Sequence, residues 1–264
     1  MCSRYSEDES NQACIWNTYA ERGYLQSVID PRDQKGLKCD YIDHWSRYYI
    51  KKFVLNWQGL DVLEIGCGSG RNLFALASYI SHGYGIDIAI KQIENAEARR
   101  RQMRIENVSF FTEHEAFFAR GTGVQRVFTM WVLAGFSSDE NLCTMLSSYC
   151  EKIPMAERFV FFEQVAQTPY VVNEEGRFYK KVRTRNEYIS ILSEVGLKVR
   201  EFRILNEKGF GPFYRFIYMS RLYKYWPEWL NINKALFTLD RYLVHREIAD
   251  TSTDCVFVCE RMKI

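Results

Sequence analysis

Three glycines spaced two residues apart form the part of this chain best suited to chemistry. Residues 62–72 read VLEIGCGSGRN, an apolar run that leads into Gly66, Gly68 and Gly70. Glycines between a strand and a helix allow a sharp turn and let a ligand lie against the main chain. The carboxylate of Asp87 follows the next β-rich run, where it can accept hydrogen bonds from ligand hydroxyls. The pattern predicts a cofactor site at the ends of two strands.

The spacing of the glycines separates two classes of cofactor site. The dinucleotide fingerprint is G-x-G-x-x-G/A, whereas here the spacing is G-x-G-x-G and Arg71 stands where the last small residue would fall. The stretch resembles the first motif of the class I, Rossmann-like S-adenosylmethionine-dependent methyltransferases. The resemblance continues at residues 85–88, 107–111 and 130–133, and it covers roughly residues 55–205. A nucleotide-dependent oxidoreductase and a non-catalytic cofactor-binding scaffold are the alternatives.

The resemblance implies S-adenosylmethionine as cofactor and S-adenosylhomocysteine as product. It implies that the three glycines line the methionine half, that Glu64 holds the amino group and that Asp87 accepts from both ribose hydroxyls. Beyond the third strand the family commonly has Asp or Asn near the adenine, and this chain departs from that pattern with Glu-His-Glu at 113–115. The remaining expected cofactor contacts are Cys67, Ile88, His114, Glu115 and Met130.

A hydroxyl acceptor needs a base within hydrogen-bond reach, and two residues are candidates. Glu163 follows a Phe-rich run at the carboxyl end of the fifth predicted strand, where an acceptor pocket is expected. Its alternative role is to pair with an arginine or to cap a backbone turn. His245, in a late insertion, is the second catalytic candidate, and its alternative is an ordinary surface or packing histidine.

Three further residues are candidates for acceptor binding. Trp131 can offer its ring face to a sulfonium, or it can simply pack in the core. Residues 177–185 hold five basic residues and two aromatic ones, and within them Tyr179 and Arg183 are expected to clamp an acidic acceptor. The alternative for this segment is a solvated loop, the usual fate of a run of charges.

The chain as a whole fits an enzyme that methylates a small-molecule or glycan-like acceptor, at oxygen. Oxygen is favoured because residues 130–133 lack the Asn/Asp-Pro-Pro-Tyr signature of exocyclic amino methylation. No nucleic-acid partner is expected, since 35 Lys and Arg against 33 Asp and Glu leave a net charge of +2. No metal site is expected, because the eight cysteines form no C-x-x-C pair.

The same cysteine pattern predicts reduced thiols and a cytoplasmic protein. The longest nearly uninterrupted apolar run, residues 127–136, is too short to span a bilayer. Oligomeric state is left open.

These residues must be positioned by a sheet. Short β-rich runs separated by helical stretches predict an α/β fold, with a doubly wound, mostly parallel, seven-stranded Rossmann-like sheet, an N-terminal helical extension and a helical insertion before the last strand. The predicted strands are 61–65, 83–88, 108–112, 125–130, 158–163, 198–205 and 254–260.

Residues 1–55 are predicted to form a tail and helical cover, and residues 56–264 a methyltransferase domain with lid-like insertions at 164–186 and 206–252. Within the cover, the polar residues 1–13 predict a frayed tail. An apolar face predicts a helix that begins near Asp40 and carries Ile42, Trp45, Tyr49 and Phe53.

Two sequences have the form of helix capping boxes, Ser137-x-x-Glu140 and Thr184-x-x-Glu187. The late insertion predicts one amphipathic helix ending at Pro227, acting as a lid or lying on a membrane surface. Its apolar face is Phe213, Phe216, Met219, Tyr223 and Trp226.

Overall fold

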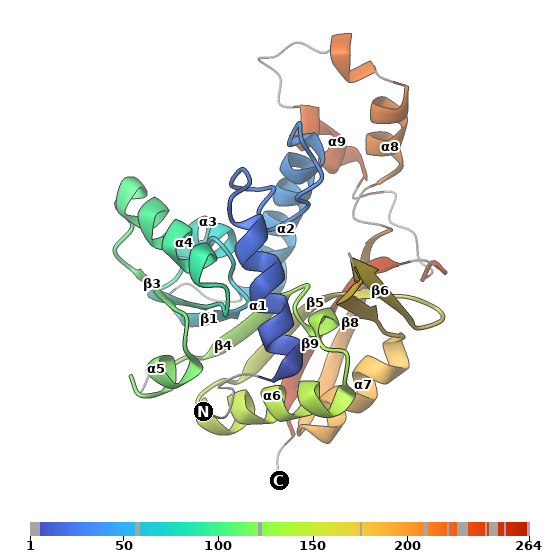
Figure 1. Cartoon of the computed structure of the whole chain (residues 1–264). Coiled ribbons are helices and arrows are strands. Elements are labelled where there is room, and N and C mark those ends of the chain that lie inside the picture. The colour runs from blue at the N-terminus through green and yellow to red at the C-terminus, as the bar shows by residue number, and fades with distance from the viewer. Residues whose placement is uncertain are drawn as a thin grey trace.

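A single sheet organises the protein (Figure 1). The computed structural model describes residues 6–55, 59–120, 123–174, 176–207, 211–220, 222–225, 232–240, 242, 248–250 and 252–262. Within them, seven strands pair in the order β3-β2-β1-β4-β5-β9-β8. They are β1 (Asp61–Ile65), β2 (His82–Ile86), β3 (Val108–Phe111), β4 (Arg126–Met130), β5 (Arg158–Val165), β8 (Leu197–Glu207) and β9 (Thr253–Arg261). Strands β1 to β5 are parallel, and β9 runs antiparallel to both β5 and β8. The predicted sheet is therefore confirmed.

Alternating side chains on the strands enter two separate apolar cores. In β5, Phe159 and Phe161 pack into one core while Val160 and Phe162 pack into the other. The first core is covered by α5 (His114–Phe118), α6 (Asp139–Lys152) and α7 (Arg185–Glu194). The second is covered by α2 (Leu37–Val54), α3 (Arg71–Leu76), which continues into η1 (Ala77–Tyr79), and α4 (Ile90–Met103). Burial on both faces explains the nearly continuous apolar runs of the strands.

The N-terminal cover contains a helix that the sequence analysis did not predict. Helix α1 (Glu7–Tyr19) lies in front of the sheet, and its N-terminus is a capping box in which Ser6 and Glu9 satisfy each other's backbone N–H groups (Figure 1). The frayed-tail prediction is wrong from residue 6 onward. Helix α1 has a mostly polar sequence without an apolar stripe. It attaches to the rest of the protein through hydrogen bonds such as that from Asn11 Nδ2 to the Phe178 carbonyl.

Helix α2 confirms the prediction for the rest of the cover. Ile42, Trp45, Tyr49 and Phe53 are buried on one face, as the spacing indicated. This face packs into the second core of the sheet.

The insertion at 164–186 is a β-hairpin, formed by β6 (Tyr170–Glu174) and β7 (Arg177–Val182). The predicted capping box at Thr184 is confirmed at the start of α7, but the one at Ser137 is wrong. Ser138 caps α6 instead by accepting from the Asn141 amide, and the Ser137 hydroxyl donates a hydrogen bond to Asp8 of α1.

The late insertion forms an arm rather than one helix. It contains α8 (Pro212–Met219), η3 (Leu222–Tyr225) and α9 (Ile232–Asp240), so the predicted helix ends at Met219. Trp226 and Pro227 lie outside the described residues. Asp240 anchors the arm by accepting hydrogen bonds from the Phe213 and Tyr214 amides and from the Tyr41 hydroxyl.

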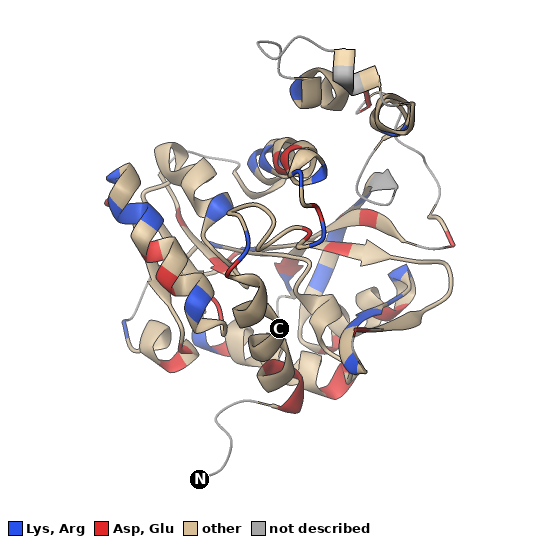
Figure 2. Cartoon of the chain, turned by 45° about the horizontal axis from the view of Figure 1, so that its top comes forward, with Lys and Arg blue, Asp and Glu red and all other residues tan. Residues whose placement is uncertain are grey.

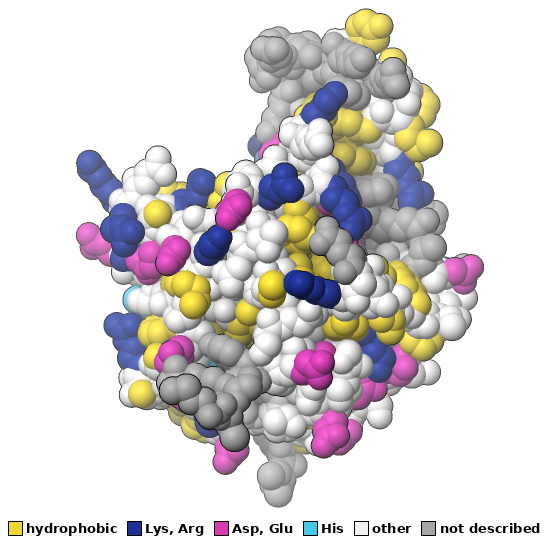
Figure 3. Space-filling view, in the orientation of Figure 1, with side chains coloured by type: hydrophobic (Ala, Val, Ile, Leu, Met, Phe, Trp, Pro, Cys, Tyr) yellow, Lys and Arg dark blue, Asp and Glu magenta, His cyan; other side chains and the backbone are white. Residues whose placement is uncertain are grey.

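The surface of the described elements is mixed in character. Figure 3 shows hydrophobic side chains on the arm, where Phe216, Met219 and Tyr225 are exposed. Lys and Arg are interspersed with Asp and Glu along the ribbons of Figure 2. In the part of the chain that the structure describes, no helix has the length and apolarity needed to cross a bilayer.

Candidate functional site

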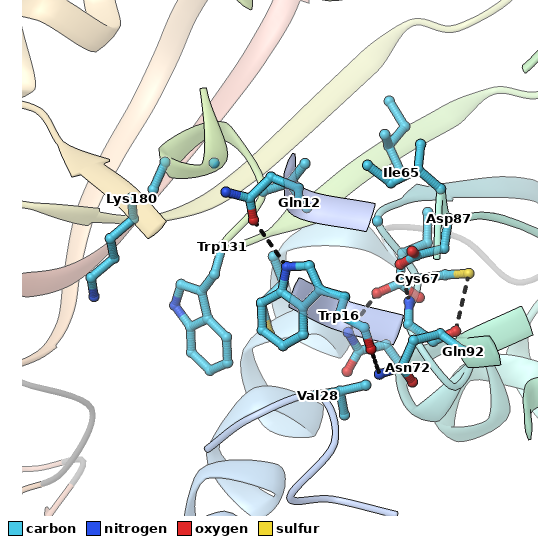
Figure 4. A pocket seen from close by; sticks show the side chains of 18 of the residues that line it. Gln12, Trp16, Val28, Ile65, Cys67, Asn72, Asp87, Gln92, Trp131 and Lys180 are labelled. Atoms are coloured by element: carbon cyan, nitrogen blue, oxygen red, sulfur yellow. Dashed lines mark hydrogen bonds between the residues drawn. The ribbon is translucent and has the colours of Figure 1, made fainter. Parts of the chain in front are cut away.

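A pocket lies at the carboxyl edge of the sheet, partly covered by α1. Figure 4 shows Asp87 and Cys67 at one end, Trp131 and Lys180 at the other, and Trp16 of α1 between them. Parallel strands bring their carboxyl ends to the same edge, which is where open α/β folds bind ligands. We call the two parts the glycine end and the tryptophan end.

The glycine end begins with backbone that only glycine accommodates. Gly66 and Gly68 have φ values of +70° and +51°, in the left-handed region. A Cβ on Gly66 would lie 2.3 Å from Val132 Cγ2, and one on Gly68 would lie 2.5 Å from Val28 Cγ1. Gly70 does not line the pocket and instead starts α3 with φ +79°. The first two glycines therefore leave bare main chain facing the pocket.

Asp87 holds this turn in place. Its Oδ2 accepts a hydrogen bond from the Gly68 amide at 2.7 Å, and its Oδ1 accepts one from the Ala89 amide at 2.8 Å. Burial raises the pKa of Asp87 to about 6, against the lowering influence of these two N–H groups. Each carboxylate oxygen retains a lone pair for a ligand hydroxyl.

Glu64 is the second buried carboxyl group of the glycine end. Asn72 Nδ2 donates to Glu64 Oε1 at 2.6 Å, while Oε2 has no hydrogen-bond partner among the described residues. Burial raises the pKa of Glu64 to about 8, although Asn72 and the Arg71 charge oppose this shift. A buried polar atom without a partner is costly, so Oε2 is suited to receive a donor from a ligand.

The tryptophan end is organised by Trp131. This residue has φ +59°, an uncommon conformation for a non-glycine residue, and its amide donates to the Phe162 carbonyl at 2.8 Å. Its ring stacks on Trp45 of α2 with centroids 6.1 Å apart, and its Nε1 donates to Asp254 Oδ1 at 3.0 Å. The ring is thus held by two elements distant in sequence.

Three polar side chains complete this end. Gln164 of β5 and Asp254 of β9 are paired in the sheet register, and Lys180 of β7 donates to Gln164 Oε1 at 2.5 Å. Asp254 Oδ2 has no hydrogen-bond partner among the described residues. Burial raises the pKa of Asp254 to about 6, despite the Trp131 N–H and the Lys180 charge. Burial also lowers the pKa of Lys180.

The structure brings most of the predicted site residues into one pocket. Those that line it are Glu64, Gly66, Cys67, Gly68, Asp87, Ile88, His114, Met130, Trp131 and Tyr179. Gly70, Glu115, Glu163 and Arg183 do not line it. His245 lies outside the described residues.

Glu163 and Arg183 lie outside the pocket and hydrogen-bond the backbone of residues 132–136, which include pocket-lining residues. Glu163 Oε1 accepts from the Val132 and Leu133 amides at 2.9 and 2.8 Å, at the start of the turn η2 (Leu133–Gly135). Arg183 donates to the Leu133 and Phe136 carbonyls and to Asp139. These positions do not fit the expected roles of base and acceptor clamp. Neighbouring strand residues face opposite ways, so Gln164 reaches the pocket where Glu163 does not.

Of the two residues expected near the adenine, one lines the pocket and the other does not. His114 lines the pocket, and its Nδ1 is hydrogen-bonded to the Tyr149 hydroxyl at 2.5 Å. Burial lowers its pKa, against Glu9 of α1, whose carboxylate lies 4.0 Å from Nε2. Glu115 is exposed on α5, so its predicted cofactor contact does not fit this structure.

Several pocket residues were not found from the sequence. They are, above all, Gln12 of α1, Gln92 of α4, and Gln164, Lys180 and Asp254 at the tryptophan end. Asp254 could not be found from the sequence, because only the antiparallel direction of β9 places its first residues, Thr253 and Asp254, at the edge where the parallel strands end. Gln12 could not be found either, because α1 lacks an apolar stripe.

Comparison with known proteins agrees with this geometry. A sequence model described as a methyltransferase domain matches residues 57–114. No curated protein matches. A Leishmania major structure described as a SAM-dependent methyltransferase is similar, with TM-score 0.60 and 14% identity over 96% of this chain and 83% of that one.

Two further structures are similar over most of their length. Geranyl diphosphate C-methyltransferase from Streptomyces coelicolor, solved with Mg²⁺, geranyl diphosphate and S-adenosylhomocysteine, gives TM-score 0.61 and 11% identity, covering 98% of this chain and 100% of that one. A [4+2]-cyclase gives TM-score 0.53 and 12% identity, covering 83% and 80%. This chain therefore has the class I, Rossmann-like methyltransferase fold that its glycine motif predicted.

Proposed function

We propose that this protein is an S-adenosylmethionine-dependent methyltransferase that methylates a small-molecule acceptor, glycan-like compounds included, at oxygen. The observation that carries the proposal is the pairing of a bare glycine turn with two buried carboxyl groups, Asp87 and Glu64, at one end of a pocket whose other end carries separate polar groups. The methyltransferase-domain match over residues 57–114 supports it. We place the activity in the cytoplasm, in keeping with the free thiols of the described cysteines.

The residues of the glycine end fit each part of this cofactor. Gly66 and Gly68 offer main chain to the methionine portion, and Glu64 Oε2 is positioned to accept from its ammonium group. Asp87 accepts from the ribose hydroxyls with its remaining lone pairs. His114 lies where the adenine is expected, beyond the third strand. When bound, S-adenosylmethionine supplies an electrophilic methyl group on a sulfonium.

The chain's own contribution to the reaction is placement. An in-line displacement is fast when the acceptor atom is held near the methyl group and opposite the leaving sulfur. Trp131 lines the tryptophan end and is fixed by its contacts with Trp45, Phe162 and Asp254. Helix α1 and the β6–β7 hairpin cover the pocket, which favours exclusion of water during transfer.

Calorimetric titration tests the cofactor proposal against its alternatives. We expect S-adenosylmethionine and S-adenosylhomocysteine to bind and NADPH not to bind. Binding of NADPH alone would favour an oxidoreductase. A cyclase shares this fold, so the fold does not by itself establish methyl transfer. A second experiment therefore measures the transfer of a labelled methyl group from the cofactor to small molecules in an extract of the source cells. Cofactor binding without such transfer would indicate a non-catalytic scaffold.

A further inference from the structure

At the tryptophan end of the pocket, Lys180 is a cation that no ion pair joins to a carboxylate among the described residues. Lys180 Nζ donates to Gln164 Oε1, and no ion pair joins it to any residue that the structure describes. The neighbouring Lys181 differs, because its Nζ is paired with Asp139 at 2.9 Å. Lys38 also lines the pocket, but its Nζ is paired with Asp30 at 2.6 Å. Lys180 is therefore the pocket lysine with charge to offer a ligand.

The same end carries a carboxylate oxygen without a partner. Asp254 is 1% exposed, and its Oδ1 is occupied by the Trp131 indole N–H. Its Oδ2 lacks a hydrogen-bond partner among the described residues. Burial of a polar atom without a hydrogen-bond partner is unfavourable, so a ligand that donates a hydrogen to Oδ2 removes a cost that the free protein bears.

Resting on the proposed function, we infer that the tryptophan end recognises an acceptor carrying an anionic group, a carboxylate or a phosphate, beside the hydroxyl to be methylated. Lys180 Nζ pairs with the anion, and Asp254 Oδ2 accepts the hydrogen of the hydroxyl. Gln164 links the two residues, since it bonds Lys180 and lies opposite Asp254 in the sheet. The acceptor is acidic, as expected from the sequence, but the residue that pairs with its anionic group is Lys180 and not Arg183.

The groups of this end account for every atom of the transfer. The hydroxyl oxygen forms a bond to the methyl carbon as the bond between that carbon and the sulfonium sulfur breaks, and sulfur keeps the electron pair. The hydroxyl proton passes to Asp254 Oδ2 and from there to solvent. The products are the methyl ether of the acceptor and S-adenosylhomocysteine. Asp254 is therefore the catalytic base, and Lys180 the residue that selects the acceptor.

Fluorine NMR tests the anion site without measuring turnover. The protein is labelled with 5-fluorotryptophan, the Trp131 signal is assigned with Trp131→Phe, and the protein saturated with S-adenosylhomocysteine is titrated with acetate and with inorganic phosphate. We expect a saturable shift of the Trp131 signal, and the anion that binds more tightly identifies the acceptor as a carboxylate or a phosphate. Lys180→Gln should weaken this binding at least tenfold, whereas Lys181→Gln should leave it unchanged.

Equal affinity in Lys180→Gln and the unchanged protein, or no response to either anion, would overturn the inference. Asp254→Asn provides the second arm: it should keep S-adenosylhomocysteine affinity and lower labelled-methyl transfer at least 100-fold, as expected for loss of a general base. Full transfer by that variant would also overturn it. Calorimetry separates the two proposals, since failure to bind S-adenosylhomocysteine counts against the proposed function, whereas normal binding without an anion effect counts against this inference alone.

Discussion

The two ends of the pocket are built in different ways. The glycine end is made largely of main chain at the ends of β1 and β2, with residues between Glu64 and Gln92, and His114 of α5 joins them. The tryptophan end is made of side chains from β5, β7 and β9 together with Trp131, which follows β4, so it spans residues 131 to 254. One end is local and rests on backbone conformation, whereas the other is assembled by the tertiary fold.

This difference suggests how the two ends respond to change. A ligand held by main chain is insensitive to most substitutions, except at glycines whose φ is positive. A ligand held by Lys180, Gln164 and Asp254 depends on single side chains, so one substitution can alter which acceptor is recognised. We therefore expect cofactor binding to fail at the glycines with positive φ and at the buried carboxyl groups of Glu64 and Asp87, and acceptor binding to fail through side-chain changes alone.

The largest effect is expected from Gly66→Ala. The new Cβ would overlap Val132 and occupy a left-handed φ, which together cost about 2–5 kcal/mol of folding stability. Thermal unfolding and calorimetry should show a marked loss of stability and no binding of S-adenosylhomocysteine. Gly196→Ala is the matched control, because φ is +77° there but nothing lies within 4 Å of the Cβ position. It should lose only about 1–2 kcal/mol and bind normally.

The next largest effect is expected from Asp87→Ala. The variant loses the acceptors for the ribose hydroxyls and for the Gly68 amide, and hydrogen bonds to a charged group contribute about 1.5–3 kcal/mol each. Affinity for S-adenosylhomocysteine should fall about 100-fold or more by calorimetry. Glu115→Ala serves as comparison, since that carboxylate is exposed and outside the pocket, and its affinity should not change. Unchanged affinity in Asp87→Ala would show that the site is misplaced.

A pH-dependent effect is expected at the tryptophan end. The pKa of Asp254 is about 6 in the folded protein against an ordinary value of 3.8, so between about pH 4 and 6 the unfolded chain releases this proton first and the folded state loses stability as pH rises. Asp254→Asn removes this dependence. Its free energy of unfolding relative to the unchanged protein should rise by about 2–3 kcal/mol from pH 4 to pH 7 in urea titrations. If the free energies of unfolding of Asp254→Asn and the unchanged protein changed with pH in the same way, the burial of the Asp254 carboxylate would be contradicted.

The smallest effect is expected at α1, which bridges the two ends. Asp8 accepts hydrogen bonds from Ser137 and Asn141, fastening the helix to the body beside η2. Asp8→Ala should loosen the cover and speed dissociation of S-adenosylhomocysteine several-fold in stopped-flow measurements, the effect of losing about 1 kcal/mol. Glu7→Ala, which changes an exposed carboxylate of the same turn, should leave the rate as it is. Equal rates in both variants would mean that α1 does not retain the ligand.

The sequence was sufficient for the sheet and for much of the glycine end. Strand periodicity located each strand of the sheet within a few residues, because strands buried on both faces read as apolar runs. Gly66, Gly68 and Asp87 were recognisable because a glycine-rich turn and the end of the next predicted strand mark them in the sequence, while their cofactor roles come from the family resemblance and stay a prediction. Trp131 was placed correctly after β4, although its stacking on Trp45 and its bond to Asp254 join elements far apart in the chain.

The tryptophan end was harder to predict because its chemistry depends on which side of a strand each side chain faces and on the direction in which the last strand runs. A shift of one residue along β5 exchanges Glu163 for Gln164, and the hairpin presents Lys180 rather than Arg183 to the pocket. Asp254 becomes a site residue only through the antiparallel course of β9. Helix α1 escaped detection because polar contacts, rather than an apolar face, attach it to the body.

A crystal structure of the protein with S-adenosylhomocysteine tests the division of the pocket most directly. We predict that the ribose hydroxyls lie within hydrogen-bond distance of Asp87, that the ammonium group meets Glu64 Oε2, and that the sulfur points toward Trp131 with Lys180 and Asp254 Oδ2 left free. A ligand whose ribose or adenine occupies the tryptophan end, in contact with Lys180 or Asp254, would contradict it.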